Sequence, residues 1–154
     1  MIAPSKKFTA STPYWPSDWQ LWITLLGAIA VVLVLRQLLP TGYASHITSS
    51  TIMLASTLLL YPLVEELLFR GVIQGELLRH DFWSRQHFFI SRANLMTSFL
   101  FALLHLVHQA PIWALAVTVP SLVMGHFRER YRSIVAALAL HVYFNGVFII
   151  AGAG

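Results

Sequence analysis

Long apolar stretches dominate the chain and alternate with short segments that carry most of the charged residues. Five stretches approach the roughly 20 apolar residues that a helix needs to cross a membrane. They cover residues 19–39, 47–63, 93–108, 111–127 and 133–151. The second runs directly into the sequence VEELLFR, and the middle three are more polar than the first and last. The pattern predicts an all-α, polytopic integral membrane protein with about five transmembrane helices.

Composition supports a membrane location. Residues of the AVILMFWYC set make up 57% of the 154 residues and charged residues only 10%, whereas soluble domains carry roughly 25% charged residues. A core of this size cannot hide so much apolar surface from water. Cysteine is absent, which excludes a disulfide scaffold, a thiolate zinc site and a cysteine nucleophile.

The basic residues predict a topology rather than a nucleic-acid surface. The formal net charge is +4, but a nucleic-acid groove needs a continuous charged face, and here the cations lie in short segments between apolar stretches. If the five spans alternate, nine of the ten lysines and arginines fall on one side, with Arg36 as the exception. The positive-inside rule makes that side cytoplasmic. We therefore expect a retained first span, a cytoplasmic N-terminus, an external C-terminus and no nucleic-acid partner.

Two adjacent acids lie within the second span, where an ionisable group costs roughly 2.5 kcal/mol or more and is a candidate functional group. Glu66 precedes Arg70 by four residues, the favourable order for a helical ion pair. Glu65 lies about 100° around the helix without a local cation, so it suits general acid–base work. Pro62 is predicted to loosen the helix just before the acids and to free a carbonyl. The alternative is that the helix has left the membrane by Val64 and both acids are solvated.

Histidines and one asparagine in later spans are the other candidates. His105 follows Phe101 on one face of the third stretch, and its alternative role is a histidine bonded to neighbouring backbone. His141 and Asn145 are four residues apart and face the same way. Two such donors in a dry site can stabilise a developing oxyanion; their alternative role is a polar contact between helices.

Glu65, His105 and His141 come from three separate helices, which favours a hydrolytic centre over a transport path. The HExxH motif of zinc proteases is absent. An aspartyl protease needs two buried aspartates, and we expect Asp18 and Asp81 to lie in polar segments. No Gly-x-Ser motif is present for a serine nucleophile. A water molecule activated by Glu and His remains.

Three motifs in order resemble those of one membrane-protease family. EELLFR (65–70) resembles the EExxxR motif of the CPBP family, also called type II CAAX prenyl proteases or the Abi family. FALLH (101–105) is similar to its FxxxH motif, and HVYFN (141–145) to its HxxxN motif. The resemblance covers roughly 47–150. It predicts a four-helix catalytic core within 47–154, preceded by an N-terminal segment and first span in 1–46.

The resemblance implies a glutamate-dependent intramembrane endopeptidase. Glu65 and His105 would activate water, and His141 and Asn145 would stabilise the oxyanion. Glu66 and Arg70 would hold the helix in place. No cofactor is implied. A zinc-dependent version is an alternative because Glu and two His can bind zinc, although zinc requires tightly converging ligands.

The compact form resembles prokaryotic members of the family, which implies the inner membrane. Those members include bacteriocin-related proteins and peptidases paired with C-terminal sorting tags such as the JDVT-CTERM type. A membrane-anchored protein or peptide, cut near a C-terminal processing signal, is therefore the expected substrate, in place of a prenylated one. One alternative is a non-catalytic protein of the same fold, acting in bacteriocin immunity or as a scaffold. Another is a proton-coupled transporter, although the chain shows no inverted repeat.

Overall fold

The computed structural model describes residues 13–38 and 50–152, and nearly all of its regular elements are helices. Lys6, Lys7 and the segment 39–49 lie outside the described residues. A two-stranded antiparallel hairpin, β1 (Gln86–His87) and β2 (Ile90–Ser91), is the exception within them. The described helices outside the second span are η1 (Trp15–Ser17), α1 (Trp19–Leu38), α6 (Asp81–Ser84), α7 (Arg92–His105), α8 (Pro111–Ala116), α9 (Thr118–Tyr131) and α10 (Ile134–Gly152).

The second span is one helix of 27 residues from Thr51 to Leu77. Ser50 caps its start by accepting a hydrogen bond from the backbone N–H of Met53. Its successive segments are α3 (Thr51–Ala55), the π-helical η2 (Ser56–Leu60), α4 (Tyr61–Glu66), the π-helical η3 (Leu67–Ile73) and α5 (Gln74–Leu77). The two π-helical segments therefore flank the turn that carries both acids.

The predicted all-α membrane fold is confirmed. Among the described residues, three helices are long and apolar enough to cross a membrane: Trp19–Gln37, Thr51–Leu77 and Ile134–Gly152. The other two expected stretches form shorter elements. Helix α7 has 14 residues, and the stretch 111–127 divides at Val117 between α8 and α9. At 1.5 Å per residue a 14-residue helix reaches about 21 Å, less than the ~30 Å hydrocarbon core.

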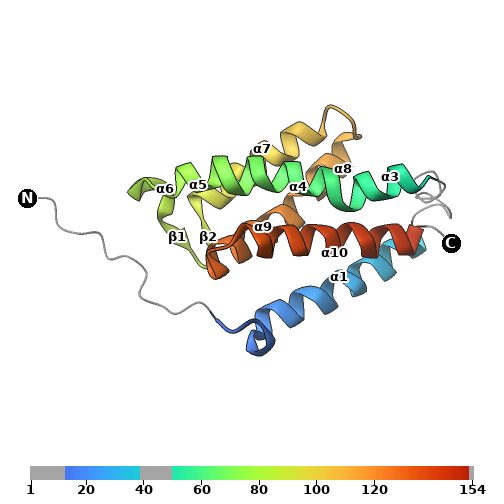
Figure 1. Ribbon diagram of the computed structural model, residues 1–154, viewed down its shortest axis with the longest axis horizontal. Helices are drawn as coiled ribbons and strands as arrows, with labels where there is room; N and C mark the ends of the chain where they lie inside the picture. The colour runs from blue at the N-terminus through green and yellow to red at the C-terminus, as the bar shows by residue number, and fades with distance from the viewer. Residues whose placement is uncertain (1–12, 39–49, 153–154) are drawn as a thin grey trace, which may run out of the picture.

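The helices pack around α10. Helix α10 (red) lies along α1 (blue) on one side and along the long second helix (green) on the other, and α7 and α9 complete the bundle (Figure 1). Met124, Phe127, Ala137 and Leu140 form the buried apolar cluster between α9 and α10. This packing brings the three motif-bearing helices together.

One end of the bundle carries most of the described arginines. The start of α1, the hairpin and the α9–α10 junction lie at this end (Figure 1). We call it the basic end and define it by Arg79, Arg85, Arg92, Arg128 and Arg130. Arg36 lies in the last turn of α1, toward the opposite end.

Asp18 joins the start of α1 to the end of α9. We expect it in a polar segment, and its partners are polar, but its side chain is buried. Its exposed fraction is 2%. Arg130 donates two hydrogen bonds to its carboxylate, at 2.6 and 3.0 Å, and the Tyr131 hydroxyl donates a third at 2.8 Å. The backbone N–H of Gln20 donates another at the helix start. The partners Arg130 and Tyr131 lie more than 100 residues away, so local sequence does not show them.

These contacts shift two pKa values in opposite directions. Burial alone raises the pKa of Asp18, but the hydrogen bonds from Arg130 and Tyr131 and the charge of Arg130 outweigh it, so the pKa lies below the ordinary 3.8. Burial, together with the hydrogen bond to Asp18, raises the pKa of Tyr131 to about 12. The ionised aspartate and the neutral tyrosine are the stabilised forms.

We expect Asp18→Asn to lower the free energy of unfolding by about 1–3 kcal/mol at pH 7, because charge-assisted hydrogen bonds are lost. The folded-state pKa of Asp18 is depressed, so its contribution is present above 3.8 and disappears as pH falls through the lower folded-state value. Detergent-solubilised protein unfolded at pH 7 and near pH 3 measures this loss. Asp81→Asn, at an exposed position, is the matched control, and an equal effect of both variants would contradict the prediction.

Candidate active site

Glu66 is a buried carboxylate shared by two other side chains. Its side chain and that of Arg70 are each 1% exposed. Arg70 Nη1 donates to Glu66 Oε1 at 3.0 Å, the ion pair that the spacing predicts. His141 Nδ1 lies 2.8 Å from the same oxygen. Because the helix continues to Leu77 and Glu66 is buried, the alternative of two solvated acids is wrong for Glu66.

His141 lies between the two acids. A carboxylate only accepts hydrogen bonds, so the contact with Glu66 requires a proton on His141 Nδ1. The other ring nitrogen, Nε2, lies 3.6 Å from Glu65 Oε2. Glu65 has a 24% exposed side chain, against 9% for His141. Glu66 thus fixes the tautomer of the imidazole, while Glu65 is the more accessible acid.

His105 approaches the same group through an aromatic ring. Its ring centroid lies 4.4 Å from that of Phe101, which lies 6.0 Å from that of His141. His105 Nδ1 donates to the backbone carbonyl of Phe101 at 2.9 Å. The alternative of a backbone-bonded histidine therefore holds for Nδ1, and no hydrogen bond to Nε2 forms within residues 13–38 and 50–152.

Asn145 contacts the second span about two turns before the acids. Its Nδ2 donates to the backbone carbonyl of Thr57 at 2.9 Å. In η2 the N–H of Tyr61 bonds to Ser56, five residues back. The same spacing assigns the N–H of residue 62 to Thr57, and residue 62 is proline, which has none. The freed carbonyl that we predict for Pro62 is thus satisfied by a side chain of α10.

A second layer of polar contacts holds Arg70. Its Nη2 donates to both the Oγ and the carbonyl of Ser121, at 2.7 and 2.9 Å. One turn later, Gln74 Nε2 donates to Glu129 Oε1 at 2.7 Å. Glu129 also accepts a hydrogen bond from Ser91 Oγ. The contacts continue from the acids toward the basic end.

Small and polar side chains on α7 and α9 make these contacts possible. Asn94 Nδ2 donates to the carbonyl of Leu122 at 2.9 Å. Gly125 lies against this carboxamide, and a Cβ atom there would collide with Asn94. Arg128 Nε donates to the carbonyl of Arg70, within the second π-helical segment, at 3.1 Å. The two π-helical segments are therefore each bonded by a side chain from another helix.

The structure brings together five of the predicted site residues: Glu65, Glu66, Arg70, His105 and His141. Asn145 lies one turn after His141 on α10 and contacts the second span at Thr57. Sequence reasoning missed four supporting residues: Gln74, Asn94, Ser121 and Glu129. The four-residue spacing of Glu66, Arg70 and Gln74, and of Ser121, Gly125 and Glu129, is the signal that would have revealed two facing polar stripes. Within the described residues, no three His, Cys, Asp or Glu side chains converge as metal ligands.

We expect Arg70→Met to lower the free energy of unfolding by about 3–5 kcal/mol, because it leaves Glu66 buried without its cation. The double variant E66Q/R70M should be less destabilised, since no uncompensated charge remains. Unfolding in mixed micelles measures both. The control is the exposed ion pair between Glu76, on the same helix, and Arg79, in the turn that follows it. E76Q/R79M should change stability by less than about 1 kcal/mol. A double variant worse than R70M would contradict this account.

We expect Asn145→Ala to cost about 1–2 kcal/mol of unfolding free energy, because the Thr57 carbonyl loses its donor away from water. In a Pro62→Ala background the cost should shrink, since the substituted position then has a backbone N–H near that carbonyl. The control is the same double-mutant cycle with Pro111→Ala, at the start of α8, in place of P62A. There the unfolding free-energy changes of P111A and N145A should simply add. An equal cost of N145A in all backgrounds would contradict the Thr57 contact.

Comparison with known proteins identifies a family for most of the chain. The description of the matching family is type II CAAX prenyl endopeptidase Rce1-like, and the match spans residues 47–147. No curated protein matches the chain, and neither does any solved structure. The matched region contains Glu65, Glu66 and Arg70 on the second span, together with His105, His141 and Asn145. This chain belongs to the Rce1-like family of type II CAAX prenyl endopeptidases.

Proposed function

We propose that the protein is a glutamate-dependent intramembrane endopeptidase. Membership of a CAAX-type intramembrane peptidase family supports the reaction class. The observation that carries the proposal is the position of His141, 2.8 Å from Glu66 and 3.6 Å from Glu65, beside the Phe101–His105 pair. Groups that exchange protons are thus gathered around one partly accessible carboxylate inside a membrane-spanning helix.

The proposed reaction is hydrolysis of a peptide bond. Glu65, assisted by His105, removes a proton from a water molecule, and the hydroxide oxygen bonds to the scissile carbonyl carbon. The C–N bond of the resulting tetrahedral species then breaks, and the proton held by Glu65 passes to the leaving amine. No other reactant is needed.

His141 is proposed as a donor to the oxyanion. Its Nδ1 proton is directed to Glu66, so donation through Nε2 requires a second proton on the ring. The second N–H of the Asn145 amide, not used by the Thr57 carbonyl, is the other proposed donor.

The proposed substrate is a membrane-anchored protein or peptide cut near a C-terminal processing signal. A sorting tag of the JDVT-CTERM type, with its membrane helix and basic tail, has this chemistry. We also propose that the basic end faces the cytoplasm of a prokaryotic inner membrane, with the N-terminus inside and the C-terminus outside. The concentration of arginine at that end supports this orientation.

Glu65→Gln in proteoliposomes tests the reaction. The probes are a farnesylated CaaX peptide and an unlipidated peptide with a hydrophobic helix and a basic tail. We expect cleavage of the second, and a loss of about 10²-fold or more in kcat/KM with E65Q, as for removal of a general base. Glu76→Gln, the same change at an exposed position of the same helix, should retain wild-type activity.

Three outcomes separate the alternatives. Wild-type rates with E65Q would rule out the glutamate mechanism. If wild type cuts neither peptide, and protein C-termini in host membranes are the same with wild type and E65Q, a non-catalytic immunity or scaffold protein is favoured. Loss of activity on chelation, restored by zinc alone, would favour the zinc-dependent alternative.

A further inference from the structure

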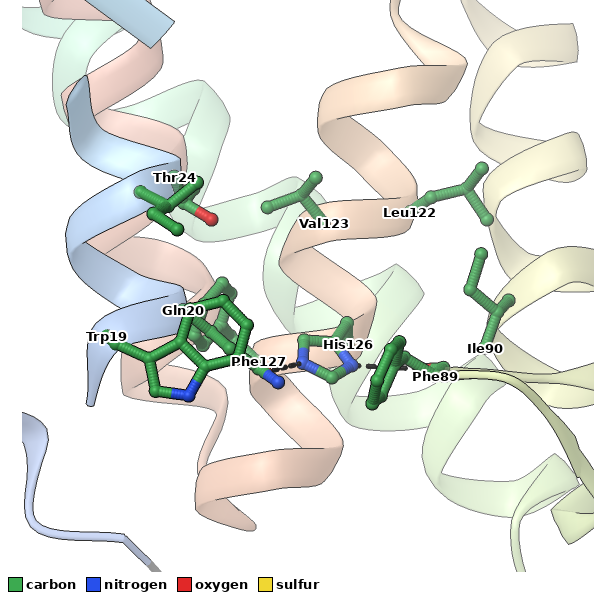
Figure 2. Close-up of a pocket in the computed structure, with 10 residues that line it drawn as sticks. Trp19, Gln20, Thr24, Phe89, Ile90, Leu122, Val123, His126 and Phe127 are labelled. Atoms are coloured by element: carbon green, nitrogen blue, oxygen red, sulfur yellow. Dashed lines mark hydrogen bonds between the residues drawn. The ribbon is translucent and has the colours of Figure 1, made fainter. Parts of the chain in front are cut away.

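A groove of about 310 Å³ lies on the far side of α9 from Arg70. Helix α1 contributes Trp19 and Ile23, α9 contributes Leu122 and Val123, and the hairpin contributes Ile90. Figure 2 shows Thr24 and Val123 facing each other across it, with Trp19, His126 and Phe89 together at one end. Apolar side chains make up most of its lining, and none of the proposed catalytic residues belongs to it.

Both ring nitrogens of His126 at that end already have partners. His126 Nδ1 donates to the carbonyl of Phe89 at 2.9 Å, and His126 Nε2 lies 3.0 Å from the Gln20 carboxamide (Figure 2). The histidine thus joins α1, α9 and the hairpin. A peptide backbone placed in the groove would bury N–H and C=O groups that need hydrogen-bond partners. The ring nitrogens of His126 cannot serve, because both are already hydrogen-bonded. The groove therefore suits a chain without hydrogen-bonding groups.

The groove opens beside a helix that can span the membrane. Trp19–Gln37 is one of the membrane-span candidates, and the groove is lined by its first two turns, from Trp19 to Thr24. This depth corresponds to the region between the head groups and the upper acyl chains, where Trp is enriched. Lipid tails are the apolar chains present at that depth.

The hairpin gives an independent indication of the membrane interface. Phe88 at its tip is 98% exposed and has a φ of 55°, a backbone conformation that is costly for an aromatic residue. The tip is fixed at its base by the His126 contact to Phe89 and by a hydrogen bond from Gln86 to Glu129. An aromatic side chain held in this way is unfavourable in water and favourable at the membrane interface.

We infer that the groove between α1, α9 and the hairpin binds one acyl chain of a membrane phospholipid, with the head group at the Trp19–His126 end. The lipid fills the space between α1 and α9, next to the contact of Asp18 with Arg130 and Tyr131. It is a structural ligand on the side of α9 opposite the proposed catalytic residues. The inference does not depend on peptide hydrolysis.

Native mass spectrometry of the full chain, delipidated in mild detergent and titrated with palmitoyl-oleoyl phosphatidylglycerol, tests this site. We expect one lipid adduct that survives at low lipid concentration. Val123→Trp, which fills the groove, should lower its occupancy at least five-fold, and Ile23→Trp on the opposite wall should do the same. Val135→Trp, at an exposed position of α10 outside the groove, is the matched control. Thermal unfolding identifies any variant that fails to fold.

A phospholipid with a diazirine near the end of its acyl chain locates the adduct. We expect crosslinks to residues 19–24 and 122–127 in wild type and in V135W, and their loss in V123W or I23W, whichever folds. An absent adduct, an adduct equally strong in the groove-filled variants, crosslinks confined to other helices, or a co-purified peptide in place of the lipid would each overturn the inference.

Discussion

The structure depends on keeping the charge of Glu66 inside a membrane-spanning helix. A buried carboxylate is tolerated only when it is paired and hydrogen-bonded. Arg70 provides the opposite charge and one hydrogen bond, and His141 provides a second hydrogen bond. The hydroxyl of Ser121 in turn accepts a hydrogen bond from Arg70. Both contacts of Glu66 go to Oε1. Each partner comes from a different turn or helix, so pairing this one oxygen fixes the relative positions of the second span, α9 and α10. The ring of His141 is oriented by the same contact, which leaves its other nitrogen directed at Glu65.

The π-helical segments solve a related problem of backbone bonding. Widening a helix changes which carbonyls lack an internal donor, and π-helical turns are frequent at functional sites. Here Thr57 receives its donor from Asn145, and the carbonyl of Arg70 receives one from Arg128. The widened turns on both sides of the acids are therefore tied to α10 and α9. The direction in which Glu65 and Glu66 point follows from these ties as well as from helical periodicity.

Periodicity and spacing were sufficient for the fold class and for the contact between Glu66 and Arg70, because both depend on local helical geometry. They also led to Pro62 as the source of a free carbonyl. They did not reveal Asp18 as a buried residue, because its partners Arg130 and Tyr131 are remote in sequence. The bond between His141 and Glu66 was missed for the same reason, since spacing within one helix says nothing about which acid a second helix approaches. The hairpin at 86–91 has no alternating pattern long enough to predict a strand.

The length of α7 has a consequence for the lipid around it. With 14 residues it reaches about 21 Å, and a segment shorter than the hydrocarbon core is accommodated by local thinning of the bilayer. Head groups and water then come closer to its ends than they do beside α10. His105 is the last residue of α7. Where the bilayer thins along this one side of the bundle, solvent has a shorter distance to travel to the imidazole.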